Sequence, residues 1–368
     1  MQQLIYLSPV PWTSFSQRPH MFVEWYHNRT GGSVLWFEPY PTRFPHFNDL
    51  QRLRSPVTGN QHNTPPAWLT VLKPGGLPVE PLPGSRWVNR RFWLPQLQQA
   101  THFALQDETL LVIGKPSVLA LELLTLLPDC LSLYDAMDNF SAFYKGFSRR
   151  ALAQRERLIA QQVDIVWTSS SQLQKHWQCC RSNVQLVSNG LDAARISPAI
   201  PTMSCSTRKI FGYVGTMAAW FDWDWVTALA NSRADDEIRL IGPLFKSPTK
   251  RLPNNIRLLP PCKHAAALKA MLEFDVGLIP FKKNELTTSV DPIKYYEYRA
   301  LALPVLSTDF GEMRLRSEAP GVFISQSEQD VEYLVQKALN CERDVEQAHA
   351  FALSNSWQVR FDAAQLLS

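Results

Sequence analysis

Residues 289–308 read SVDPIKYYEYRALALPVLST, the most informative stretch of the chain for its fold class. A polar loop leads into a short helical pattern, which we expect to begin at Pro292, and an apolar strand follows around Val305. Proline suits the first position of a helix because its missing N–H group would have no helical partner there. Loop, helix and strand in this order are typical of an α/β domain with a parallel sheet.

The first turns of the predicted helix carry two charged side chains, Lys294 and Glu297. Free N–H groups at a helix N-terminus bind anions, and Lys294 adds positive charge at the same end. The Glu297 carboxylate can accept hydrogen bonds from a pair of hydroxyl groups. A phosphate followed by a ribose diol would fit this helix, although an amphipathic helix with a solvated Lys and Glu has the same spacing.

The alternation of strands and helices extends through the rest of the chain. Strand patterns at 4–7, 110–113 and 165–169 each precede a helical pattern, and a second series has strands at 210–214, 238–241, 256–258 and 276–279. The strand at 210–214 ends in Gly215 and Thr216, where glycine lets the backbone approach a ligand closely. Between Arg43 and Trp93 eight prolines interrupt the pattern, so we expect long irregular loops there.

Length and pattern together predict two domains. The chain has 368 residues, whereas single hydrophobic cores stop growing at roughly 250 to 300 residues. We place an N-terminal domain at 1–192, a linker at 193–207 and a C-terminal domain at 208–345. A C-terminal helix within 346–368 is expected to pack back on the first domain.

Composition excludes several classes of protein. No apolar run reaches the roughly 20 residues of a membrane-spanning helix, and the N-terminus reads as a strand rather than a signal peptide, so we expect a cytoplasmic protein. The net charge of +4 is small and dispersed, which argues against a nucleic-acid binder. Neither a dinucleotide-binding G-x-G-x-x-G, a P-loop nor an H-x-x-x-H pair occurs, so we expect no cofactor and no obligatory metal.

Residues 289–308 resemble the donor-binding helix of GT-B glycosyltransferases, in which a Pro-x-Lys-x-x-Glu-Tyr stretch precedes a Pro-Val-Leu strand. The strands at 210–214, 238–241 and 276–279 match others of that family in the same order. The resemblance implies the GT-B fold, two Rossmann-like parallel-sheet domains facing a cleft. It also implies that Glu297 holds the nucleotide ribose, that Lys294 binds the diphosphate, and that Gly215 and Thr216 face the diphosphate.

One position departs from the family pattern. Many retaining members carry a second Glu eight positions before the ribose Glu, where it holds a sugar hydroxyl, and here that position is Ser289. Either Asp291 takes over this acidic role, or this branch holds its sugar differently.

The first half contributes further candidates. Gln17-Arg-Pro-His20 resembles a segment that opens a bacterial subset of these enzymes. At the end of a strand, Arg18 and His20 could contact the donor phosphates or the acceptor hydroxyl, Arg18 as a donor-binding and His20 as a catalytic candidate. A structural role for His20 is the alternative. Residues 134–140 resemble a Tyr-Asp-x-x-Asp-x-Phe segment of the same subset. Asp135 or Asp138 could act as general base in an inverting reaction, or Asp138 or Ser141 could cap the following helix.

The resemblance implies a glycosyltransferase of the hexosyltransferase class, which moves a sugar from a nucleotide-diphosphate-sugar to a saccharide or lipid-linked acceptor in bacterial surface polysaccharide or glycoconjugate synthesis. Two alternatives stay open: a GT-B-like nucleotide-sugar epimerase, and a non-catalytic nucleotide-sugar-binding scaffold.

Charge is unevenly distributed. Residues 1–200 carry 18 Lys and Arg against 13 Asp and Glu, and several of the tryptophans lie there. Arg86, Arg90 and Arg91 flank Trp87 and Trp93, a combination suited to peripheral contact with anionic lipid at the inner face of the cytoplasmic membrane. The competing interpretations are core aromatics with solvated arginines, and a groove that binds sugars.

Overall fold

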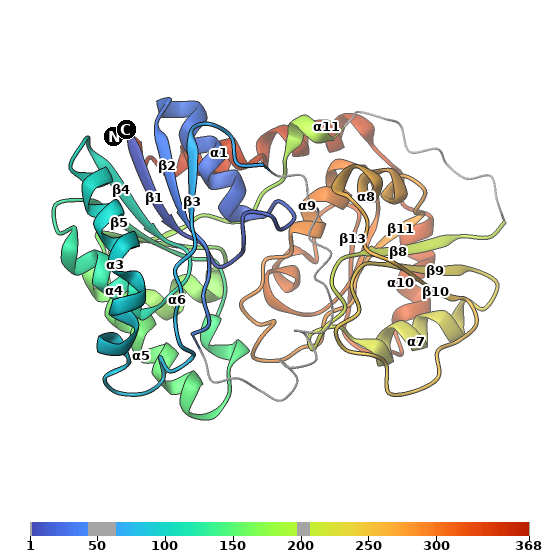
Figure 1. Ribbon diagram of the computed structural model, residues 1–368. Helices are drawn as coiled ribbons and strands as arrows, with labels where there is room; N and C mark the ends of the chain where they lie inside the picture. Colours follow the sequence, from blue (N-terminus) through green and yellow to red (C-terminus); the bar gives the residue numbers. More distant parts are fainter. Residues whose placement is uncertain (1, 43–63, 197–206, 368) are drawn as a thin grey trace. The chain divides into compact units, whose positions relative to one another are not determined.

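The computed structural model describes residues 2–42, 64–196 and 207–367. The chain forms two compact units: unit 1 comprises Met1–Val187 and Phe361–Ser368, and unit 2 comprises Ser188–Arg360. Each unit is built around one parallel sheet (Figure 1). This confirms the predicted α/β class with two parallel-sheet domains. The segment 193–196 at the start of the expected linker belongs to unit 2.

Within its described residues, unit 1 has seven parallel strands in the spatial order β3-β2-β1-β4-β5-β6-β7. The strands are β1 (Gln3–Leu7), β2 (Ser33–Phe37), β3 (Leu69–Leu72), β4 (Thr109–Ile113), β5 (Leu131–Ala136), β6 (Ile165–Thr168) and β7 (Val184–Leu186). The helices are α1 (Arg18–Thr30), α3 (Ser85–Ala104), α4 (Val118–Leu126), α5 (Gly146–Gln162) and α6 (Ser171–Gln178), with a 3-10 turn η1 (Phe140–Phe143). Helices α3 to α6 cover one face of the sheet.

The other face of this sheet is covered by α1 and by the end of the chain. Helix α12 (Trp357–Ala363) brings Phe361 into the core, where its ring lies 5.4 Å from Phe22 and 5.3 Å from Trp25. The Trp25 Nε1 donates to Asp362 at 2.9 Å. The last residues thus complete the hydrophobic core of unit 1.

The described part of unit 2 holds six parallel strands in the order β10-β9-β8-β11-β12-β13. The strands are β8 (Ile210–Val214), β9 (Glu237–Ile241), β10 (Ile256–Leu259), β11 (Val276–Ile279), β12 (Val305–Thr308) and β13 (Val322–Ser325). The helices are α7 (Trp223–Ser232), α8 (His264–Met271), α9 (Ile293–Ala300), α10 (Val331–Leu339) and α11 (Val345–Ser354), with 3-10 turns η2 (Ala193–Arg195) and η3 (Gly311–Arg316). Helices α8, α9 and α11 pack on one face, and α7 and α10 on the other.

The expectation of irregular loops between Arg43 and Trp93 was partly wrong. Residues 43–63 lie outside the described residues, but β3 and the first half of α3 occupy much of the remainder. The prolines made this segment read as a loop. Those at 74–83 lie before the helix, and Pro95 lies within it on the exposed side, so none of them prevents α3 from forming. A narrow seam of Asn89, Trp93 and Leu97, four residues apart, faces the core. No helix in the described ranges has the length and apolar character needed to span a bilayer.

Candidate functional site

The predicted donor helix is α9, which follows β11 and begins one residue later than expected, with Pro292 in the N-cap position. Glu297 is buried, and its carboxylate accepts hydrogen bonds from Lys294 Nζ and, at 3.1 Å, from His264 Nε2. Lys294 and Glu297 therefore contact each other within the helix. No sequence pattern had singled out His264, the first residue of α8.

These neighbours control the charge of Glu297. Burial by itself would raise the pKa of this carboxyl, but the Lys294 ammonium and the hydrogen bond from His264 outweigh burial and lower the pKa to about 2. Glu297 is thus a fixed carboxylate at neutral pH, able to accept hydrogen bonds but not to donate a proton.

Asp291, the other acidic candidate beside this helix, already has a full set of partners. Its Oδ1 accepts from Arg316 at 2.6 Å, while its Oδ2 accepts from Tyr296 at 2.9 Å and from the Asn189 backbone N–H at 2.8 Å. This carboxylate holds α9, η3 and the start of unit 2 together. Ser289 is buried in the preceding turn.

Gly215 and Thr216 lie at the carboxyl end of β8, half-buried. The backbone is crowded there: Gly242 has φ +142°, and a Cβ on it would lie 2.1 Å from the Gly215 carbonyl oxygen. The Thr216 carbonyl accepts from the Tyr213 hydroxyl at 3.1 Å. Glycine is therefore required where β8 and β9 end, at the edge of a parallel sheet where ligands bind.

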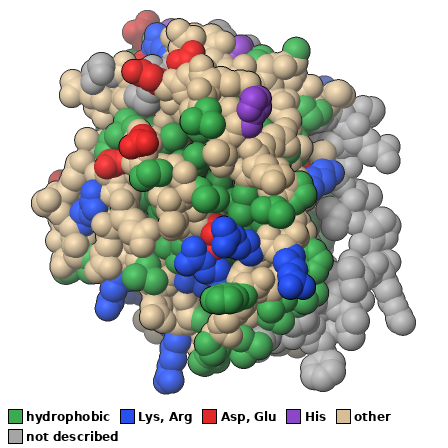
Figure 2. Space-filling model, turned by 60° about the vertical axis from the view of Figure 1, so that its left-hand side comes forward, with side chains coloured by type: hydrophobic (Ala, Val, Ile, Leu, Met, Phe, Trp, Pro, Cys, Tyr) green, Lys and Arg blue, Asp and Glu red, His purple; other side chains and the backbone are tan. Residues whose placement is uncertain are grey.

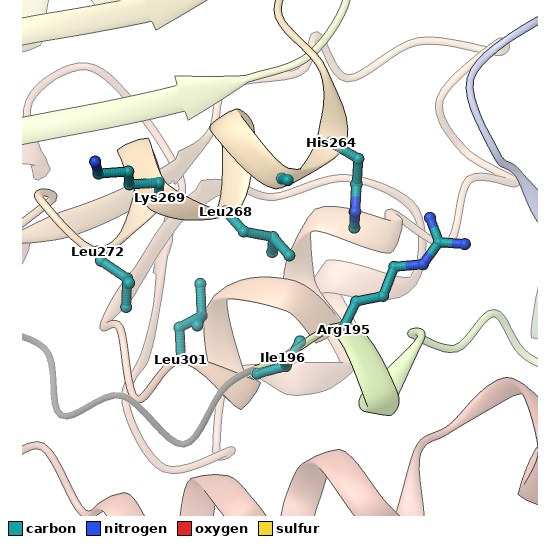
Figure 3. A pocket seen from close by; sticks show the side chains of 8 residues that line it. Arg195, Ile196, His264, Leu268, Lys269, Leu272 and Leu301 are labelled. Carbon is teal, nitrogen blue, oxygen red and sulfur yellow. The ribbon is translucent and has the colours of Figure 1, made fainter. Parts of the chain in front are cut away.

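A cavity of about 420 Å³ lies next to His264, between η2, α8 and the end of α9. Apolar side chains such as Leu268 and Leu301 form its wall, and Arg195, Lys269 and His264 contribute the positively charged or titratable groups (Figure 3). Arg195 is also paired with Asp192, Nε to Oδ2, at 2.7 Å.

In unit 1, the candidates Arg18 and Asp135 form a buried ion pair. Arg18 opens α1 and Asp135 lies near the end of β5; the Arg18 Nε contacts both carboxylate oxygens, at 3.1 and 3.0 Å, and the second guanidinium nitrogen contacts Oδ1 at 2.8 Å. Arg18 also donates to the Val187 carbonyl at 2.7 Å. Both groups are almost inaccessible to solvent, so this pair orients α1 against the sheet.

Asp138 follows β5 and has a different environment. Burial raises the pKa of its carboxyl most; Arg18 opposes this effect, Asp135 adds to it, and the resulting pKa is about 7. The carboxylate makes no hydrogen bond or ion pair with any residue that the structure describes. Neither Asp138 nor Ser141 caps α5, because Lys145 occupies that position; the capping alternative is therefore wrong.

His20 is buried, and both of its ring nitrogens are occupied. Nδ1 accepts from the Gln17 backbone N–H at 3.3 Å, which leaves Nε2 to donate to the Trp12 carbonyl at 3.1 Å. Burial lowers the pKa of this imidazole. The contacts of His20 stabilise the start of α1.

Carboxylates elsewhere have local roles. The sequence contains one D-x-D, Asp222-Trp-Asp224; Asp222 caps α7 by accepting from Trp225 N at 3.2 Å, and Asp224 accepts from Lys250 at 3.3 Å. Within the described ranges, no group of three or more His, Cys, Asp or Glu side chains is placed to hold a metal ion.

The chain resembles a known protein over part of its sequence and solved structures over its whole length. No protein-family model matches the chain. Over 199 residues it is 24% identical to the "Putative teichuronic acid biosynthesis glycosyltransferase TuaH" of Bacillus subtilis (strain 168), an alignment that covers 48% of this chain and 50% of that protein. The chain thus spans about half the length of the curated relative it matches.

Solved structures resemble the whole chain. The sucrose-phosphate synthase of Thermosynechococcus elongatus has a TM-score of 0.70 at 12% identity, covering 100% of this chain and 98% of that one. HepE of Anabaena, solved in complex with UDP-glucose, has a TM-score of 0.68 at 14% identity, covering 99% of each chain. At such identities the likeness establishes the fold, and it confirms the predicted GT-B fold.

Proposed function

We propose that this GT-B chain is a glycosyltransferase of the hexosyltransferase class that moves a sugar from a nucleoside diphosphate to a saccharide or lipid-linked acceptor. The observation that carries the proposal is the Glu297 carboxylate, buried, ionised at neutral pH and situated one turn into α9. A ribose diol offers two hydroxyl donors to such an acceptor. HepE was solved with UDP-glucose, which favours a UDP-sugar here.

In the proposed donor site, the nucleotide diphosphate lies at the N-terminus of α9 near Lys294, with the ends of β8 and β9 beside it. Helix N–H groups and a lysine stabilise negative charge on the leaving diphosphate without a metal. We therefore propose metal-independent turnover. Lys294 must exchange part of its contact with Glu297 for the phosphate, and three ammonium protons allow it to keep both partners.

On the acceptor side, we assign Asp138 as the group that takes the proton of the attacking hydroxyl, the task of a carboxylate in an inverting transfer. A pKa of about 7 suits a general base at neutral pH. Arg18 and Asp135 serve as positioning residues, since their charges satisfy each other.

The test is a panel of UDP-, GDP-, dTDP- and CMP-sugars, first for binding and then for sugar release to water or to an acceptor. We expect UDP-sugar to bind most tightly and to turn over with a chelator present. Binding without turnover toward any acceptor would refute an enzyme and support a scaffold.

The relative named for teichuronic acid biosynthesis supports a proposal for the biological setting. We propose a role in bacterial surface polysaccharide synthesis, on the cytoplasmic side of the membrane, where lipid-linked acceptors would be within reach.

A further inference from the structure

Helix α3 presents an unusual surface to solvent. Its exposed residues include Trp87, 82% accessible, Val88 at 46% and Leu94 at 49%. With 3.6 residues per turn, Trp87, Arg91 and Leu94 lie along one line of the helix, with Val88 next to it and the buried seam of Asn89 and Trp93 on the opposite side. Single exposed apolar residues are ordinary, whereas several gathered on one side of a helix form a candidate interaction surface.

Helix α3 itself carries charges of one sign only. No Asp or Glu occurs from Pro81 to Gln106, while Arg86, Arg90 and Arg91 lie within one and a half turns. Arg86 is in contact with Glu122 of α4, and Arg90 Nε lies 3.9 Å from the same carboxylate. Arg91 is exposed and has no carboxylate partner among the described residues. Trp93, predicted to belong to this patch, is instead fully buried and donates to the Gly75 carbonyl at 2.8 Å.

A second group of exposed apolar side chains lies at the start of α5. Phe143 is 47% exposed and Phe147 56%; Lys145 and Arg150 are exposed beside them, and no acid occurs from Asn139 to Arg155. Helix α4 contacts both α3 and α5, and each of α3 and α5 starts at the carboxyl edge of the sheet. Figure 2 turns this side of the molecule to the viewer and shows basic side chains gathered around an acidic group, with hydrophobic ones beside them.

We propose that Trp87, Val88, Arg91 and Leu94 of α3, with Phe143 and Phe147 near the start of α5, form a docking surface for an anionic lipid bilayer. Aromatic and aliphatic side chains enter the headgroup layer while arginines contact lipid phosphates. A protein partner would need complementary acidic and apolar groups at fixed positions, whereas a bilayer supplies both everywhere. This surface adds a partner to the proposed function, because α5 begins eight residues after Asp138 and a lipid-linked acceptor would be delivered near that carboxylate.

The experiment is co-sedimentation of the full chain with vesicles of phosphatidylcholine alone or with phosphatidylglycerol. We expect binding to the anionic vesicles that weakens as salt rises, and an apparent dissociation constant raised at least about tenfold in Trp87→Ser with Arg91→Glu. The matched control is Tyr333→Ser with Lys337→Glu on α10, an exposed pair with the same spacing in unit 2, which should bind as the wild type does.

Unchanged UDP binding and thermal unfolding of both variants, measured without lipid, show that they are folded. Failure of UDP to bind would count against the donor site alone. The docking surface is refuted if no binding to anionic vesicles occurs at low ionic strength, if phosphatidylcholine vesicles bind equally well, or if the α3 variant binds like the control.

Discussion

Replacing Glu297 with Gln keeps the shape of the side chain and removes the charge on which the proposed donor site depends. In the folded protein the pKa of Glu297 is about 2 instead of the ordinary 4.5, which at about 1.4 kcal/mol per pKa unit corresponds to about 3 kcal/mol in favour of the ionised form. The Lys294 and His264 side chains are 23% and 36% exposed, so water compensates part of the loss.

We therefore expect Glu297→Gln to reduce the stability of unit 2 by about 1 to 2 kcal/mol, or about 3 to 6 °C in Tm. The contribution of the wild-type carboxylate is complete above pH 4.5 and is lost as pH falls towards 2, because its pKa is lower in the folded state. In the variant, the stability should be less dependent on pH over that range.

The effect on donor binding is separable from stability. A hydrogen bond to a charged acceptor contributes about 1.5 to 3 kcal/mol, so UDP should bind about 10- to 150-fold more weakly to Glu297→Gln. Titration calorimetry with UDP and 2′-deoxy-UDP gives the sharper test. Wild type should discriminate between the two ligands, and Glu297→Gln should not.

Lys294→Met is the matched control, since it breaks the same ion pair but retains the carboxylate. The Lys294→Met variant should bind both UDP and 2′-deoxy-UDP more weakly and should still discriminate against 2′-deoxy-UDP. Equal discrimination by wild type and a folded Glu297→Gln would refute the assignment of Glu297 to the ribose.

Other perturbations test the remaining assignments. Asp138→Asn should lower kcat by about 10²- to 10⁴-fold while UDP affinity stays the same, and wild-type kcat/KM should rise with pH through about 7 as this carboxyl loses its proton; a flat profile would exclude Asp138 as the base. Asp135→Asn should cost about 3 to 5 kcal/mol in unfolding free energy, because it leaves Arg18 buried beside a neutral group, and a denaturation midpoint equal to that of wild type would contradict the ion pair. Gly242→Ala should destabilise unit 2, since its Cβ would lie 2.1 Å from the Gly215 carbonyl oxygen. A normal yield and Tm would show that the backbone can shift to accommodate this Cβ. Chelation should leave turnover unchanged, and restoration of lost activity by Mg²⁺ or Mn²⁺ would overturn metal independence.

From the sequence alone one could predict the α/β class and a helix that begins next to Pro292. Buried strands such as 210–214 and 276–279 are apolar runs bounded by polar turns, and the helices between them follow a local period. Lys294 and Glu297 could be predicted to lie together for the same reason, because a loop, a proline and a charged first turn are neighbours in the chain. Helix α3 was not predicted, because the prolines before and within it made its helical spacing of apolar residues hard to recognise.

Which candidate side chains already have partners could be seen only in the folded chain. Arg18 and Asp135 are 117 residues apart, yet the ends of their elements meet at one sheet edge, where each neutralises the other and Asp138 is left without a partner among the described residues. Asp291 is occupied by Arg316, and His264 joins Glu297 from another helix. Trp87 is exposed and Trp93 is buried, because only one side of α3 packs against the core. Ionisation and accessibility depend on neighbours brought together by strand order and helix packing, and these neighbours are distant in the chain.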